Sequence, residues 1–117
     1  MQVANSQPTT LLALDRFDVY RRAFRLAELV RQIDVRADLR NQMIRAADSV
    51  VLNLAEAQGR SAGHRAQSLE VARGSLYEVG AALDLSTLSL GETGTIAAAR
   101  DETRRIAAML ARLCRRN

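Results

Sequence analysis

Lysine and tryptophan are absent from this chain of 117 residues, and proline, cysteine and histidine occur once each. The single cysteine, Cys114, excludes an internal disulfide and suits a reducing compartment, so we expect a cytoplasmic protein. The single proline, Pro8, leaves the chain from Thr9 onward free of proline breaks. No apolar run approaches the ~20 residues that a membrane-spanning helix needs, so we expect no membrane partner.

The start of the chain lacks both the basic residues and the apolar stretch of a signal peptide. We expect residues 1–12 to form a flexible N-terminal tail and residues 13–117 to form a single domain. A domain of this length can bury a core without disulfides or metals.

Arginine supplies every basic side chain, and the formal net charge is +4. The planar guanidinium group binds phosphate or carboxylate through two parallel hydrogen bonds, which favours a role in phosphate binding. A compositional bias of the coding DNA explains the same observation equally well, so both explanations stay open.

Alanine and leucine dominate the apolar residues, and both favour helices. Apolar residues recur at steps of three and four over residues 15–33, 38–58 and 61–90, and from Thr93 or Thr95 to the C-terminus. No strand-like alternation is present. Four long helices with short connections predict an all-α fold, an up-down-up-down antiparallel four-helix bundle.

Glycines mark the expected ends and weak points of these helices. We expect Gly59 to end the second helix in a left-handed conformation and Ser61 to cap the third. Gly74 and Gly80 interrupt the third helix at a cost of ~1 kcal/mol each relative to alanine. We interpret both as positions of close helix packing, where a side chain would clash.

Three stretches carry a resemblance to a known family. They are Phe17-Asp-Val-Tyr20 with Ala23, Gln42-Met-Ile-Arg45-Ala-Ala47 running into Asn53-Leu-Ala-Glu56 and Gly59-Arg60, and Val71-Ala-Arg-Gly74-Ser75-Leu76-Tyr-Glu78. In combination they resemble the small four-helix-bundle family that includes proteins encoded in intervening sequences of bacterial large-subunit ribosomal RNA genes. The chain departs from the family pattern at Ser49-Val-Val51, where proline is usual, at Ala57, where glycine is usual, and in a shorter loop carrying His64.

The resemblance implies a soluble, non-enzymatic helical bundle. Related members assemble as homopentameric rings, so it also implies a homo-oligomer, with a pentamer favoured. The wide apolar surface of the segment 38–58 independently favours oligomerisation. One distant branch serves as the accessory factor of diversity-generating retroelements and binds RNA and a reverse transcriptase.

A group of polar residues recurs on two helices that the bundle would place side by side. Glu56 and Arg60 have the four-residue spacing of a helical ion pair, and Asn53 lies on the same face. Arg73 and Glu78 return along the antiparallel third helix. We interpret these five residues as a structural polar network, because buried polar groups need partners. A catalytic or ligand site is the alternative.

Metal and nucleophile chemistry find little support in the sequence. A di-metal site in a bundle needs Glu-x-x-His pairs, and no glutamate lies three residues before His64, so we expect no metal and no cofactor. Ser49, Ser75 or Cys114 would need a positioned base to act as a nucleophile. We therefore expect no catalytic residue and no enzymatic activity.

The alternating topology brings the start of the first helix, the connection after the second and the end of the fourth to one end. The arginines expected there are Arg16, Arg21, Arg22, Arg60, Arg65, Arg112, Arg115 and Arg116. They outnumber the three local carboxylates, Asp15, Asp18 and Glu56. We name this end the basic pole, and its excess of positive charge is typical of a phosphate-binding surface.

Two function hypotheses from different classes follow. In the first, the protein is an RNA- or nucleoprotein-binding adaptor whose candidate binding residues are Arg16, Arg60, Arg65, Arg112, Arg115 and Arg116. The basic pole lacks interleaved aromatic residues, so contacts to the nucleic-acid backbone or shape are expected. In the second, the basic pole is a solvated helix end whose arginines complement the helix dipole. The protein is then a scaffolding homo-oligomer that binds a protein partner and no nucleic acid.

Overall fold

The computed structural model describes residue 14 and residues 17–115. Within this part of the chain there are four α-helices and no strand: α1 Asp18–Val30, α2 Ala37–Gln58, α3 Ala62–Leu90 and α4 Gly94–Arg115. The predicted all-α, four-helix fold is confirmed. The predicted tail, residues 1–12, lies outside the described residues.

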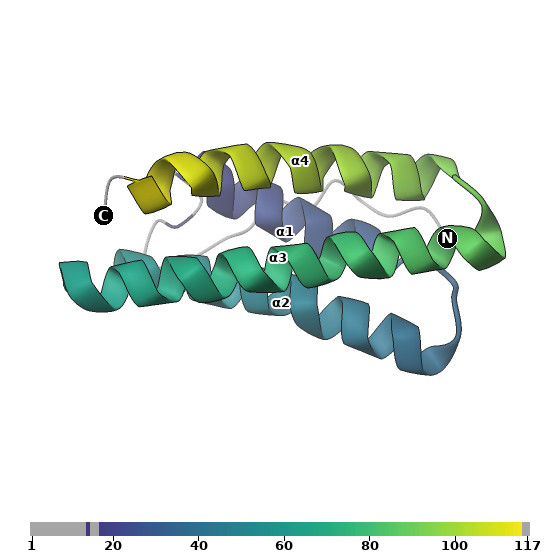
Figure 1. Ribbon diagram of the computed structural model, residues 1–117, viewed down its shortest axis with the longest axis horizontal. Helices are drawn as coiled ribbons and strands as arrows, with labels where there is room; N and C mark the ends of the chain where they lie inside the picture. The colour runs from purple at the N-terminus through teal and green to yellow at the C-terminus, as the bar shows by residue number, and fades with distance from the viewer. Residues whose placement is uncertain (1–13, 15–16, 116–117) are drawn as a thin grey trace.

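Consecutive helices run in opposite directions and are joined by short connections (Figure 1). Each helix packs against two neighbours, since α2 contacts α1 and α3, and α4 contacts α3 and α1. With 29 residues at ~1.5 Å per residue, α3 extends along nearly the whole bundle, whose longest dimension is 42 Å. The starts of α1 and α3 therefore share one end with the ends of α2 and α4.

Aliphatic side chains from all four helices fill the core along the bundle axis. Leu26 of α1, Met43 of α2, Leu76 of α3 and Ile106 of α4 are fully buried, as are many neighbours at steps of three and four. By contrast, the residues that precede α1, α2 and α3 make no side-chain cap hydrogen bond. Burial of the inner faces rather than capping therefore holds these helices in place.

The glycine that follows α2 behaves differently from the prediction. Gly59 follows α2 with φ −99°, so the expected left-handed conformation is wrong; its amide instead donates to the carbonyl oxygen of Glu56. The left-handed glycine is Gly91, with φ +70°, at the end of α3. Ser61 precedes α3, but its hydroxyl lies 3.2 Å from His64 Nδ1 and makes no cap hydrogen bond to a backbone amide.

Gly74 and Gly80 lie inside α3, and a Cβ atom added at either one would meet no described atom within 4 Å. The predicted close packing is therefore wrong at both positions. Gly74 lies on the exposed face of α3, where no other described helix approaches it.

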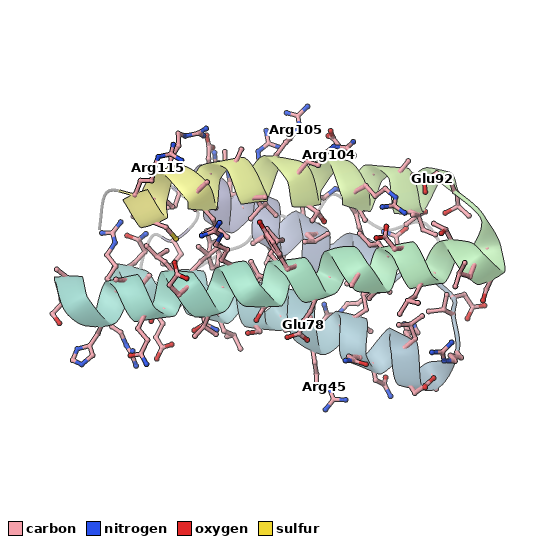
Figure 2. The ribbon with its side chains drawn as sticks, viewed as in Figure 1. Arg45, Glu78, Glu92, Arg104, Arg105 and Arg115 are labelled. Atoms are coloured by element: carbon pink, nitrogen blue, oxygen red, sulfur yellow. The ribbon has the colours of Figure 1, made fainter. Side chains whose placement is uncertain are left out.

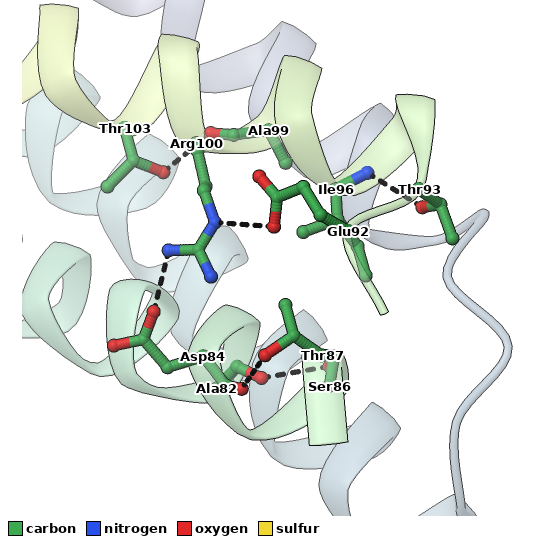
Figure 3. Close-up of polar contacts among 10 residues, drawn as sticks. All are labelled: Ala82, Asp84, Ser86, Thr87, Glu92, Thr93, Ile96, Ala99, Arg100 and Thr103. Atoms are coloured by element: carbon green, nitrogen blue, oxygen red, sulfur yellow. Dashed lines mark hydrogen bonds and ion pairs between the residues drawn. The ribbon is translucent and has the colours of Figure 1, made fainter. Parts of the chain in front are cut away.

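A cluster of polar contacts holds the corner between α3 and α4 (Figure 3). Arg100 donates to Asp84 at 2.6 Å and to Glu92 at 3.1 Å, so it joins α3, the connection and α4. These hydrogen bonds, the Asp84 bond first, raise the pKa of Arg100 above its ordinary value. Of the two threonines at the expected start of the fourth helix, Thr93 and Thr95, Thr93 caps α4, because its hydroxyl accepts the amide of Ile96 at 3.2 Å.

Candidate nucleic-acid interface

The basic pole contains six of its predicted arginines within the described residues. They are Arg21 and Arg22 in α1, Arg60 after α2, Arg65 at the start of α3, and Arg112 and Arg115 in the last turn of α4. The carboxylates at the same end are Asp18 and Glu56 in the helix ends and Glu70 of α3, which neighbours Cys114 in the last turn of α4. The other two candidate residues, Arg16 and Arg116, lie outside the described residues. The fold therefore brings four of the six candidate binding residues to one end.

Three arginines of the basic pole already hold carboxylates. Arg21 pairs with Asp18 in the first turn of α1. Arg60 donates to Glu56 at 2.6 Å, which is the four-residue pair expected from the spacing. Arg22 donates to Glu102 at 2.7 Å and thereby joins α1 to α4 across 80 positions of sequence.

The remaining three arginines have more capacity to bind an anion. Arg112 and Arg115 are exposed, and neither pairs with a carboxylate among the described residues. Figure 2 shows Arg115 at the C-terminal end of α4. Arg65 is half-buried, and its Nε is buried without a hydrogen-bond partner in the described part of the chain. Part of the positive charge at this end is thus not neutralised by neighbouring side chains.

The opposite end of the bundle provides a comparison within the same molecule. Its described arginines are all partnered: Arg31 with Asp48, Arg36 with Asp38, Arg40 with the carbonyl oxygen of Arg31, and Arg100 with Asp84 and Glu92. Three of these four arginines pair with carboxylates, and Arg40 alone does not, so the unneutralised excess of arginine is larger at the basic pole. This contrast between the ends gives the molecule an electrostatic polarity along its long axis.

Phe17 adds an aromatic ring to the basic pole. The apolar pattern predicts that this residue lies on the buried face of the first helix, but its side chain is 39% exposed directly before α1. A single ring is not the succession of aromatic side chains on which single-stranded nucleic acid stacks. Backbone contacts by arginine therefore remain the main chemistry that this end offers.

The predicted polar network is only partly gathered. The Glu56–Arg60 pair stays within α2 and the residues that follow it. Arg73 and Glu78 are exposed on α3 and, among the described residues, make no hydrogen bond or ion pair with Asn53 or with that pair. Asn53 instead donates to the carbonyl oxygen of Ser49 at 2.9 Å and to its hydroxyl at 3.2 Å.

The polar link between α2 and α3 is a pair of serines. The hydroxyl oxygens of Ser49 and Ser75 lie 2.8 Å apart, and Ser75 is buried. Sequence reasoning considered both only as nucleophiles and missed the link. The available signal was the presence of two small polar residues on the inner faces of helices predicted to be adjacent. A shallow groove of about 350 Å³ above them is bordered by Gln42, Arg45 and Glu78.

Other reactive groups offer little chemistry. Burial raises the pKa of the Cys114 thiol, and the neighbouring Glu70 raises it further, so the reactive thiolate is disfavoured. His64 is exposed and pairs with Ser61. Among the described residues, no group of three or more histidine, cysteine or acidic side chains is arranged to hold a metal ion. No helix in the same part of the chain is long and apolar enough to cross a membrane.

The sequence pattern of the 23S rRNA-intervening sequence protein family matches residues 15–112, which is most of the chain. The chain belongs to this family. The resemblance predicted from three short stretches is confirmed. No curated protein matches the chain. The matched region includes Arg60, Arg65 and Arg112, whereas Arg115 lies just beyond it.

Proposed function

We propose that this 23S rRNA-intervening sequence protein is a non-enzymatic, homo-oligomeric adaptor that binds structured RNA, free or within a nucleoprotein, through its basic pole. The observation that supports the proposal is the position of Arg65, Arg112 and Arg115. They converge at one end of the bundle without carboxylate partners among the described residues, whereas at the opposite end Arg31, Arg36 and Arg100 all pair with carboxylates.

RNA phosphates are the chemistry that fits this arrangement. A guanidinium group binds a phosphate through two parallel hydrogen bonds, and each such interaction releases condensed counterions. Binding is then weak for one copy, independent of base sequence and strongly dependent on salt. In a homo-oligomer several copies of the basic pole act together, and their weak interactions multiply through effective concentration.

The test is the affinity of a structured RNA hairpin, measured by fluorescence anisotropy over a range of salt concentrations. The variant Arg112→Glu/Arg115→Glu should lower the affinity. It should also flatten the plot of log affinity against log salt by roughly 0.7–0.9 for each phosphate that the variant no longer binds. The matched control is Arg104→Glu/Arg105→Glu, which makes the same charge change on exposed positions of the same helix (Figure 2).

Binding of the hairpin at low salt decides between the two hypotheses. If the parent protein does not bind the hairpin at low salt, the adaptor function is excluded. If both double variants weaken binding equally, RNA responds to the net charge of the protein and not to the basic pole.

The second candidate function, a scaffolding homo-oligomer without nucleic acid, is favoured by a different observation. Large apolar side chains are exposed along α3, including Tyr77 and Leu88 at 63% and 82% exposure. Exposed apolar surface of this kind marks protein–protein contact. The family resemblance favours a pentamer. Light scattering that gives only the monomer mass of 12.9 kDa at micromolar concentration would exclude the homo-oligomer in both hypotheses.

A further inference from the structure

The outward face of α3 carries a continuous row of small and apolar residues. We name it the α3 ridge, and its members are Val71, Gly74, Tyr77, Ala81, Leu85 and Leu88, all exposed. They recur at steps of three or four, like the buried residues on the opposite face of the same helix. A helix that is apolar on both faces is typical of a helix that is covered on both.

A second apolar surface lies between α1 and α2. We name it the α1–α2 groove; it has a volume of about 390 Å³ and is lined by Phe24, Ala27, Glu28, Arg31, Asp48, Val51 and Leu52. Four of these seven lining residues are aliphatic or aromatic, and three are charged. Leu52 is 67% exposed, although it borders an apolar surface. The ridge and the groove are two different surfaces of one chain, and neither is covered by the described part of a single copy.

Two charged residues give these surfaces a common register. Arg45 lies seven residues before Leu52 on α2, and Glu78 lies seven residues before Leu85 on α3. Seven residues correspond to ~10.5 Å along either helix. If α3 of one copy lies parallel to α2 of another, Leu85 can therefore enter the groove beside Leu52 while Glu78 meets Arg45.

The charges of Arg45 and Glu78 suit such a contact. Both side chains are exposed at the border of the groove above Ser49 and Ser75, and within one copy they form no ion pair with each other or with another described residue. Figure 2 shows Arg45 extending outward from α2, away from the rest of the bundle. An opposite charge at the matching position of another copy would neutralise each of them and fix the register of the apolar contact.

We infer that the α3 ridge of one copy occupies the α1–α2 groove of a second copy, with Arg45 of the groove copy paired to Glu78 of the ridge copy. This inference rests on the proposed homo-oligomer and assigns its interface. Because two different surfaces meet, the contact is heterologous. Repetition of a heterologous contact produces a closed ring or, if the rotation does not close, a filament.

Two variants, each with one damaged and one intact surface, test the inference when they are mixed. Leu52→Asp damages the groove and leaves the ridge intact, whereas Leu85→Asp damages the ridge and leaves the groove intact. Each variant alone should have the monomer mass of 12.9 kDa by light scattering. Mixed in equal amounts, they should form a dimer and nothing larger, because only one intact ridge and one intact groove remain to meet.

Folding is controlled independently. Far-ultraviolet circular dichroism should show unchanged helical content for both variants, because both side chains are exposed. Leu88→Asp, at the most exposed of the large apolar side chains of the ridge, replaces Leu85→Asp if the latter has reduced helical content. The charge pair is tested by Arg45→Glu and Glu78→Arg, each of which should weaken assembly, while the double exchange should restore it.

The outcomes separate the interface from the proposed function. A monomeric parent protein would overturn the homo-oligomer together with its interface. An oligomeric parent whose Leu52→Asp variant assembles normally would overturn the interface alone, as would a ridge-to-ridge dimer that needs no groove. RNA binding by the basic pole is measured separately and does not depend on these results.

Discussion

Ser49 and Ser75 join α2 to α3 through hydroxyl oxygens that lie 2.8 Å apart. Asn53 donates to Ser49 from the same helix, so Ser49 keeps a partner if Ser75 is removed, whereas Ser75 depends on Ser49 in the described structure. The two serines therefore stabilise the bundle as a unit.

Ser49→Ala should lower the free energy of unfolding by about 1 kcal/mol, because it leaves the Ser75 hydroxyl without its partner. Ser75→Ala should lower it by less, because Ser49 keeps its hydrogen bond from Asn53. The double change should lower the free energy of unfolding by less than the sum of the two single changes, since both polar groups are then removed together. Urea unfolding monitored by circular dichroism measures all three values. Ser89→Ala, on the exposed side of α3, is the control. Strictly additive costs would show that the serines do not interact.

Gly80→Ala should raise the free energy of unfolding by about 0.5–1 kcal/mol, because the added methyl meets no described atom within 4 Å and alanine favours the helix. Gly91→Ala should lower it by about 1–3 kcal/mol, because Gly91 has φ +70°. Thermal unfolding compares the two variants, and the melting temperature should shift by about 4–8 °C for each kcal/mol in a domain of this size. A lower melting temperature for Gly80→Ala would mean that this side of α3 is packed in solution.

Cys114 should react with iodoacetamide more slowly in the folded protein than in urea at the same pH. Burial, followed by the effect of Glu70, raises the pKa of the thiol and so lowers the thiolate fraction. Glu70→Gln should speed the reaction, whereas Arg73→Gln should slow it, because Arg73 lowers the pKa. Mass spectrometry of the alkylated protein over a pH series measures these rates.

The same raised pKa contributes to stability in a defined pH range. A raised folded-state pKa means that the neutral thiol favours the folded protein. That contribution is complete below the pKa of the unfolded thiol, about 8.5, and disappears as the pH rises through the folded-state value. Equal alkylation rates in the folded protein and in urea would contradict both statements.

The sequence predicts the buried faces of the helices well, because apolar residues at steps of three and four lie on one side of a helix, and that side packs in the core. Ile96, Ile106 and Leu110 of α4 fit the steps of three and four that predict a core position, and all are fully buried. The same rule fails for Phe17, which fits the apolar pattern but precedes the first turn of α1, where no other described helix covers it.

Helix ends are less predictable than helix faces. Both Gly59 and Gly91 follow a helix, and the sequence alone does not say which one adopts positive φ. The difference lies in how the next helix must be placed, which is a tertiary property. The prediction for Gly74 is wrong for a related reason, since a glycine with no neighbour and one in a tight contact look identical in sequence.

For the candidate site, the sequence predicts which end of the bundle an arginine occupies better than it predicts the carboxylate with which that arginine pairs. Alternating topology is enough to place Arg60, Arg65, Arg112 and Arg115 at one end. The Arg60–Glu56 pair follows from four-residue spacing. The bond from Arg22 to Glu102 does not, because it depends on how α1 and α4 are rotated against each other. Only the structure therefore shows which arginines keep an unneutralised charge.

The connection between α2 and α3 is only three residues long, whereas α1 must meet α4 from near the opposite end of the sequence. A short connection costs little chain entropy to close, so the α2–α3 hairpin is a local structure. During synthesis, α1 leaves the ribosome before α4 has been made. The apolar side of α1 that contacts α4 thus stays uncovered until translation is almost complete, which makes the nascent chain most vulnerable to wrong association in that interval.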